Sequence, residues 1–248
     1  MPRPGYMSRD IVEKAVQVSL RRMGVPTLDL LQFHWWDYGD FAYMDALTYL
    51  AQLRNEGKIR HLALTNFDTD HLKRITDQGI RIVSNQVQYS IIDRRPEVKM
   101  AAYCEQNNIT LLTYGTVCGG LLSEKYSVKA EPGRSELDTA SLRKYKNMID
   151  AWGDWALFQE LLAVLKSIAD KHGVSVANVG TRYILDKLAV AGVILGARLG
   201  VSEHRADNAR VFDFALDLDD LNRIHSITDQ SNDLFQMIGD CGDEYRQL

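Results

Sequence analysis

Hydrophobic and polar residues follow two alternating patterns along this chain. Short, nearly continuous apolar runs, such as residues 27–33 and 59–65, are typical of strands buried on both faces of a sheet. Between such runs, apolar residues recur every three or four positions, as Ile11 and Ala15 and then Val16 and Leu20 do within residues 8–23, and this spacing is typical of an amphipathic helix. The pattern therefore predicts a chain in which strands and helices alternate.

The alternation continues to the end of the chain with one interruption. Residues 116–155 contain GG and PG pairs and many polar positions without a clean period, which predicts a long loop of the kind that forms lids and binding loops. Residues 229–248 are expected to form a C-terminal tail. The expected strands are 27–33, 59–65, 80–86, 109–115 and 189–197, and the expected helices are 8–23, 41–55, 69–78, 96–107, 155–172, 175–187, one capped by Ser202, and 218–227.

Alternating strands and helices predict a parallel sheet, either doubly wound or closed into a (β/α)8 barrel. No G-x-G-x-x-G opens a helix, so the dinucleotide-binding form of the doubly wound sheet has no support. Polar residues instead gather where strands end, and barrel active sites lie at such ends. We therefore expect an α/β fold, an incomplete (β/α)8 barrel of five strands, as a single domain over residues 1–248. The strand-end residues are His34, Thr65, Asn66, Gln86 and Tyr114.

Composition narrows the class of protein further. With 46% hydrophobic and 25% charged residues the chain can bury a large core, and its net charge of −4 argues against nucleic acid as a partner. Cys104, Cys118 and Cys241 show no C-x-x-C spacing, which argues against a disulfide framework and favours a reducing compartment. No apolar run approaches the roughly 20 residues of a membrane span. We expect a cytoplasmic protein without a metal or membrane partner.

Five stretches resemble, in order, the fourth to eighth strands of the aldo-keto reductases. They are LDLLQFHWWD (28–37), GKIRHLALTNFD (57–68), SNQVQYS (84–90), LLTYGTVCGGLLSEKY (111–126) and GVILGARLGVSEHRADN (192–208). No single stretch is specific, but five in the right order at the right spacing are. The resemblance extends from about Ser8 to Leu221 and implies that NADPH (or NADP+) binds across the barrel mouth, without a Rossmann unit.

The resemblance also implies roles for single residues. Thr65, Asn66 and Gln86 are expected to hold the nicotinamide carboxamide, because their side chains can both donate to and accept from it. Tyr114 is expected to stack under the nicotinamide ring, and Arg198 to pair with the 2′-phosphate, which suits a guanidinium. The other expected cofactor contacts are Gly115, Val117, Gly196, His204, Asp207 and Asn208.

The chemistry of the family uses an Asp, a Tyr, a Lys and a His, and His34 matches the last of these. Consecutive strand residues point to opposite sides, so one of Trp35 and Trp36 is expected at the substrate, and we expect Trp35 to form that wall. The other three catalytic residues belong to the second and third strands, and we expect this chain to begin after them. The resemblance thus implies reduction of a small carbonyl compound once the missing part is supplied. The alternatives are a non-catalytic NADPH-binding module and an inactive truncated fragment. In each case the bare edges of the sheet are expected to favour self-association.

Overall fold

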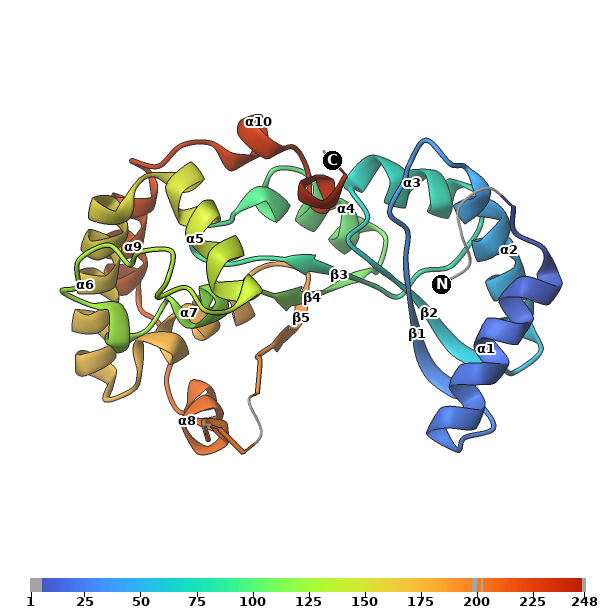
Figure 1. Cartoon of the computed structure of the whole chain (residues 1–248), viewed down its shortest axis with the longest axis horizontal. Helices are drawn as coiled ribbons and strands as arrows, with labels where there is room; N and C mark the ends of the chain where they lie inside the picture. Colours follow the sequence, from blue (N-terminus) through green and yellow to red (C-terminus); the bar gives the residue numbers. More distant parts are fainter. Residues whose placement is uncertain (1–5, 198–199, 202, 247–248) are drawn as a thin grey trace. The chain divides into compact units, whose positions relative to one another are not determined.

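The computed structural model describes residues 6–197, 200–201 and 203–246. Its five parallel strands form one sheet in the order β1-β2-β3-β4-β5, and the sheet does not close, because β1 and β5 are not neighbours (Figure 1). This arrangement confirms the expected α/β class with a partial barrel. The chain divides into two compact units, unit 1 being Met1–Val87, Lys99–Leu112 and Asp240–Leu248, and unit 2 being Gln88–Val98 and Thr113–Gly239.

Unit 1 carries the first strands and the helices that cover them. Its first helix starts at the expected cap, since Ser8 Oγ accepts a hydrogen bond of 3.4 Å from the Ile11 N–H, and ends at Gly24 with a left-handed φ of 66°. Leu62 and Leu64 are fully buried on the second strand, which lies against the second helix. The elements are α1 (Arg9–Met23), β1 (Leu28–His34), α2 (Ala42–Asn55), β2 (Ile59–Thr65), α3 (Thr69–Asp77), α4 (Met100–Gln106), most of β3 (Ser84–Gln88) and β4 (Thr110–Tyr114), and the 3-10 turn η5 (Asp243–Tyr245).

The third strand lies further along the chain than its hydrophobic run predicts. We expected residues 80–86, whereas the ladder covers Ser84–Gln88. Ile80 and Ile82 are buried, but the chain meets β2 only at Val83, whose N–H donates to the Leu62 carbonyl (2.9 Å). Burial and ladder pairing are separate properties, so an apolar run does not fix where a strand begins.

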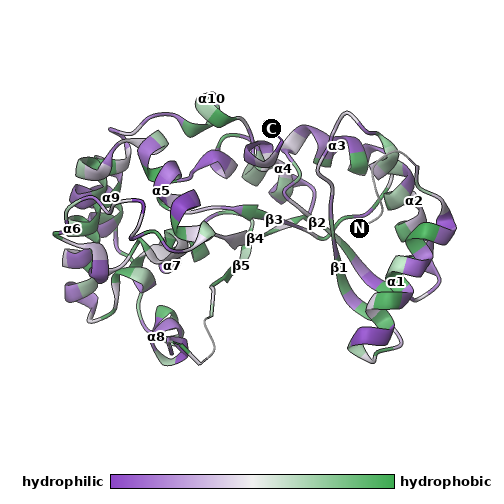
Figure 2. Cartoon of the chain, in the orientation of Figure 1, coloured by the Kyte–Doolittle hydropathy of each residue, from purple (hydrophilic) through white to green (hydrophobic). Residues whose placement is uncertain are grey.

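Unit 2 is built around one large hydrophobic cluster. Its longest helix, α6, starts where Asp154 Oδ1 accepts from the Leu157 N–H (2.7 Å) and ends at Gly173, as the pattern predicts. Hydrophobic and hydrophilic positions alternate along its ribbon (Figure 2), and Phe158, Leu161 and Leu165 are fully buried. The elements are η1 (Arg95–Glu97), η2 (Cys118–Gly120), η3 (Glu124–Tyr126), α5 (Ala140–Trp152), α6 (Trp155–His172), α7 (Val176–Leu185), β5 (Val190–Ile194), α8 (Arg205–Ala209), η4 (Arg210–Phe212), α9 (Leu218–Thr228) and α10 (Leu234–Ile238).

The expectation of one long loop over residues 116–155 is wrong for its second half, which forms α5. Thr139 Oγ1 caps this helix by accepting from the Leu142 N–H (3.1 Å). Tyr145, Ile149 and Trp152 recur at helical spacing and are buried. The polar residues between them dilute the pattern, which is why the period is weak in the sequence.

Three further boundaries differ from the expected ones. The helix expected over 96–107 divides into η1 and α4, and the helix expected to be capped by Ser202 starts at Arg205 instead. Ser202 lies outside the described residues. Residues 229–248, expected as a tail, contain α10 and η5. Across the described part of the chain, no helix combines the length and the apolar character that crossing a bilayer requires.

Candidate functional site

Three of the predicted site residues lie side by side on neighbouring strands of unit 1, two of them at the strand carboxyl ends and Gln86 in the middle of β3. His34 of β1 is in register with Thr65 of β2, and Thr65 is in register with Gln86 of β3. Residues in register on neighbouring parallel strands project to the same face of a sheet. The parallel pairing therefore places the His34, Thr65 and Gln86 side chains in one row.

His34 lies half-buried among aromatic rings. Its ring centroid is 4.4 Å from that of Trp36 and 6.4 Å from that of Tyr245, which meets it edge-on. Its Nε2 atom is buried and has no hydrogen-bond partner among the described residues. Burial, and then the positive charge of Arg246, hold the pKa of His34 below its ordinary value. The imidazole is therefore poised to be neutral near neutral pH, with one ring nitrogen available to a ligand.

The two tryptophans after His34 take opposite positions. Trp35 is buried, stacks on Phe33 with a centroid distance of 5.8 Å, and donates from its indole nitrogen to the Asp40 carbonyl (3.1 Å). Trp36 is 54% exposed and packs against His34. The substrate wall assigned to Trp35 stays a prediction, and the geometry favours Trp36 for that role.

Asn66 and Gln86 are held by specific contacts at the same strand ends. Asn66 adopts a left-handed φ of 56°, a conformation that Asn tolerates better than most residues, and its N–H donates to the Gln86 carbonyl (2.9 Å). The Gln86 side-chain oxygen accepts from Gln32 Nε2 (2.8 Å). This bond fixes the orientation of the Gln86 amide and leaves its nitrogen as a donor.

In unit 2, Tyr114 ends β4 and Gly115 turns the chain away. The ammonium of Lys144 lies 5.4 Å from the centroid of the Tyr114 ring. Gly115 has a left-handed φ of 73°, and a side chain there would collide with the ring of Tyr145. The Gly115 carbonyl accepts from the Cys118 N–H (2.8 Å), which makes the tight turn that contains Val117. The sequence around Tyr114 thus needs glycine for a steric reason.

The remaining expected cofactor contacts, which follow β5 in the chain, differ in their surroundings. Asp207 is bound to α7, since Ser175 Oγ donates to its carboxylate (2.8 Å) and Asn178 Nδ2 donates to its carbonyl (2.9 Å). His204 is exposed and immediately precedes α8, where its carbonyl accepts from the Asn208 N–H (2.7 Å). Gly196 is exposed, and a side chain added there would meet open space. Arg198 lies outside the described residues.

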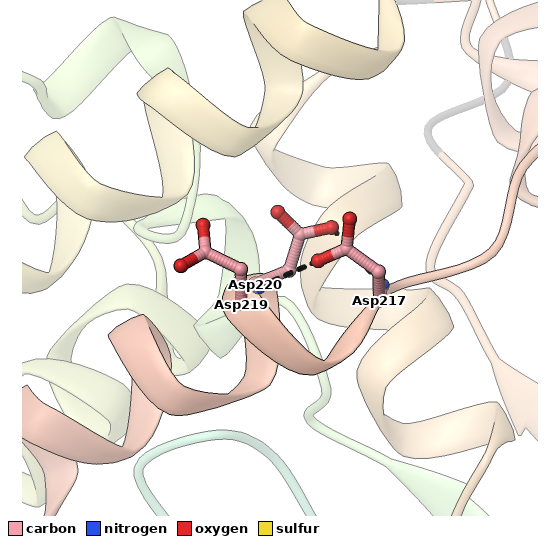
Figure 3. A group of neighbouring side chains, drawn as sticks. All are labelled: Asp217, Asp219 and Asp220. Carbon is pink, nitrogen blue, oxygen red and sulfur yellow. Dashed lines mark hydrogen bonds between the residues drawn. The ribbon is translucent and has the colours of Figure 1, made fainter.

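A cluster of acidic residues at the start of α9 is explained by helix capping (Figure 3). Asp217 Oδ1 accepts from the Asp220 N–H (2.9 Å), and Asp220 Oδ2 accepts from the Asp217 N–H (3.2 Å), forming a capping box. Lys171 Nζ lies 2.6 Å from Asp217 and 2.8 Å from Asp220, and His172 also bonds to Asp220 (2.7 Å). Asp217, Asp219 and Asp220 are the only group of three or more possible metal ligands in the described part of the chain. Lys171 already supplies the cation that this cluster would otherwise attract.

Sequence reasoning missed two residues near His34, Tyr245 and Arg246. The guanidinium of Arg246 lies 3.8 Å from the centroid of the Tyr38 ring and donates to the carbonyl oxygens of Trp35 (2.7 Å) and Asn66 (2.6 Å). No local signal marks these residues, because both lie in the segment that reads as a tail.

Comparison with known proteins places this geometry in a family. Flagellar radial spoke protein 5 of Chlamydomonas reinhardtii is 34% identical over 185 residues, which are 66% of this chain and 34% of that protein. The structure resembles the glycerol dehydrogenase of Gluconobacter oxydans (TM-score 0.73, 24% identity, 94% of this chain and 66% of that one). It also resembles an aldo/keto reductase of Klebsiella pneumoniae in complex with NADP and acetate (TM-score 0.62, 21% identity, 87% and 64%).

The chain spans 34% to 61% of the length of the curated relatives that it matches. The model of the Aldo/keto reductase family matches residues 1–229, which is most of the chain. It matches across the stretches that carry His34, Thr65 and Gln86, and it reaches the end of α9. This chain therefore belongs to the aldo/keto reductase family.

Proposed function

We propose that this chain binds NADPH and takes part in the reduction of small carbonyl compounds to alcohols. The observation that carries the proposal is the row of His34, Thr65 and Gln86, formed by strand register, with a buried and unpartnered His34 Nε2 beside it. A buried polar atom without a partner costs free energy until a ligand satisfies it. A carbonyl oxygen of a substrate is a ligand that a histidine N–H can satisfy.

The strand-end side chains of unit 1 fit the nicotinamide amide. The Gln86 amide nitrogen, oriented by Gln32, would donate to the carboxamide oxygen, and Thr65 and Asn66 would complete the contacts. Bound NADPH would supply the hydride that the carbonyl carbon receives, and the oxygen would take its proton from water. His34, neutral near pH 7, would orient the carbonyl oxygen by a hydrogen bond. In unit 2, Tyr114 is proposed for the nicotinamide ring, and Arg198, His204 and Asn208 for the adenosine phosphate.

The second candidate is a binding module that holds NADPH without catalysis. It is favoured by the surroundings of His34, whose side-chain neighbours in the described residues are rings and the Arg246 charge. A positioned proton donor is worth a factor of about 10²–10⁴ in rate. Without one, binding would persist while reduction becomes slow. A cytoplasmic location is proposed for either candidate.

Titration with NADPH, followed by the fluorescence of the four tryptophans, tests the shared part of both candidates. We expect saturable binding that is tighter for NADPH than for NADH. Arg198→Met should weaken NADPH binding by about tenfold or more, as expected for a charge-assisted pair, while NADH binding changes little. Arg205→Met is the matched control, because Arg205 is exposed and already pairs with Glu203 (2.7 Å). A folded protein that binds neither nucleotide would contradict both candidates.

Carbonyl-dependent oxidation of NADPH separates the two candidates. With a series of small aldehydes and dicarbonyl compounds, the reductase consumes NADPH and forms the alcohol, and His34→Gln slows this reaction while leaving NADPH binding unchanged. The binding module shows the same titration without carbonyl-dependent oxidation. A rate equal in wild type and His34→Gln would remove His34 from the reaction.

A further inference from the structure

The C-terminal strap, which we define as residues 240–246, returns to the strand ends of unit 1. Its first residue, Asp240, accepts a hydrogen bond from the Thr69 N–H at the start of α3 (2.8 Å). Its last residue, Arg246, reaches the ends of β1 and β2. The strap therefore lies against the part of unit 1 that carries the proposed carbonyl-binding residues.

Arg246 binds both strand ends at once. Its Nη2 donates to the carbonyl of Trp35, the neighbour of His34 (2.7 Å), and its Nη1 donates to the carbonyl of Asn66 (2.6 Å). The planar guanidinium also stacks on the Tyr38 ring at 3.8 Å. A guanidinium presents several donors in a rigid fork, so one side chain fixes the relative position of the backbone that follows His34 and the backbone of Asn66.

The close approach of the strap depends on a glycine. Gly242 has a left-handed φ of 92°, and a side chain at this position would collide with the carbonyl of Asn66. The Gly242 carbonyl accepts a second hydrogen bond from Arg246 Nη1 (2.8 Å). Gly242 and Arg246 thus meet the same strand-end carbonyl, one by close packing and one by a hydrogen bond.

The strap also supplies part of the surroundings of His34. Tyr245 meets the rings of His34 and Trp36 edge-on, with centroid distances of 6.4 Å and 6.0 Å. The Arg246 charge opposes protonation of the imidazole, in addition to burial. The strap therefore contributes one charge and one ring contact to His34, beside the nearer ring of Trp36.

We propose that Arg246 is a positioning residue for His34 and Asn66, and that the strap holds the carbonyl-binding end of the site in its working arrangement. This inference rests on the proposed function for its consequence in catalysis. The positioning itself is a property of the unliganded protein. Arg246 would act through the backbone and through Tyr245, without contacting the reacting atoms.

Proton NMR of His34 in the unliganded full chain tests the positioning directly. In the wild type we expect NOEs between the His34 and Tyr245 rings and a His34 titration midpoint below 6.5. Arg246→Met should remove the NOEs and raise the midpoint. Arg246→Lys keeps the charge and loses the fork, so it should remove the NOEs with a smaller rise of the midpoint. Arg205→Met is the control, and the exposed His61 serves as an internal reference in all variants.

Two further variants keep the test decisive should Arg246→Met fail to fold. Gly242→Ala should displace the strap and so remove the NOEs, while Gly24→Ala, a left-handed glycine without close neighbours, should leave them intact. Tyr245→Leu retains the Arg246 fork, so the His34 midpoint should stay low. Unchanged NOEs and midpoint in a folded Arg246 or Gly242 variant would overturn the proposal.

Catalysis and positioning fail in distinguishable ways. We expect Arg246→Met to lower carbonyl-dependent NADPH oxidation by about 10²-fold, because small displacements of catalytic groups have effects of that order. NADPH affinity in the same variant should fall less than the rate, by at most the roughly tenfold that about 1.4 kcal/mol gives, because of the cofactor contacts only Asn66 is held by Arg246. Failure of the wild type to bind NADPH would remove the proposed function and leave the NMR comparison valid. Normal oxidation in Arg246→Met would overturn the positioning role.

Discussion

Arg246 Nη2 donates a hydrogen bond of 2.7 Å to the carbonyl of Trp35, which lies 211 residues earlier in the chain. The contact joins the end of the described chain to the first strand. It places a cation beside His34, where its charge opposes protonation of the imidazole. The chemical state of His34 therefore depends on a segment that is remote in sequence.

The stability of the protein should fall with decreasing pH partly because of His34. The pKa of His34 lies below 6.5 in the folded state through burial and the Arg246 charge, so the unfolded chain binds the proton more readily. Stability is lost as the pH falls through about 6.5. His34→Gln lacks this titration and is otherwise the same chain. Urea unfolding at several pH values should show that the free energy of unfolding falls less in the variant than in the wild type below about pH 6.5. A difference between the two proteins that stays constant with pH would contradict this account.

The two adjacent tryptophans should respond oppositely to replacement. Trp35→Ala removes a buried ring and is expected to cost about 3–5 kcal/mol of unfolding free energy. Trp36→Ala removes an exposed ring, so its stability cost should stay within about 0.5 kcal/mol, while the KM for the carbonyl substrate rises. Denaturation midpoints and steady-state kinetics check the pair. A rise of KM in a folded Trp35 variant and not in the Trp36 variant would restore the first assignment.

Gly115→Ala should disturb the end of β4. Alanine at a left-handed φ costs about 1–2 kcal/mol, and its methyl group would also collide with Tyr145. We expect a lower thermal midpoint and weaker NADPH binding, because Tyr114 loses its position. Gly24→Ala is the control, since Gly24 also has a left-handed φ but has open space around it. Equal effects of the two substitutions would show that the contact with Tyr145 is unimportant.

The ion pair of Asp93 and Arg95 should be the most sensitive charged contact of unit 2. Both side chains are almost fully buried, Arg95 Nε donates to Asp93 (2.8 Å), and Gln88 Nε2 donates to the same carboxylate (2.7 Å). Asp93→Ala leaves the guanidinium buried without its carboxylate and should cost about 3–5 kcal/mol.

Chemical denaturation with two further variants checks the origin of that cost. The double variant Asp93→Ala/Arg95→Met should be less destabilised than Asp93→Ala alone, because it removes the stranded charge. Asp29→Ala breaks a solvent-exposed pair with Arg60 and should change stability by less than about 1 kcal/mol. A double variant that loses the full sum of both single losses would refute the coupling.

Local signals predicted most of the elements that carry the site. The strand over 59–65 and the helix over 155–172 have the expected bounds, because the largely apolar run of the strand and the cap at each end of the helix are local properties. The helix over Ala140–Trp152 was missed, because polar residues interrupt its apolar stripe. The displaced start of β3 reflects pairing with β2, which a single strand cannot encode.

Local patterns in the sequence predict which polar side chains lie at or near the strand ends. His34 and Thr65 end β1 and β2, Gln86 lies within β3, and parallel pairing brings the three into one row. The packing of Trp36 on His34 and the binding of Arg246 beside it are visible only in the folded chain. The first result follows from periodicity within short segments. The second depends on contacts between segments far apart in the chain, whose free energy no local pattern records.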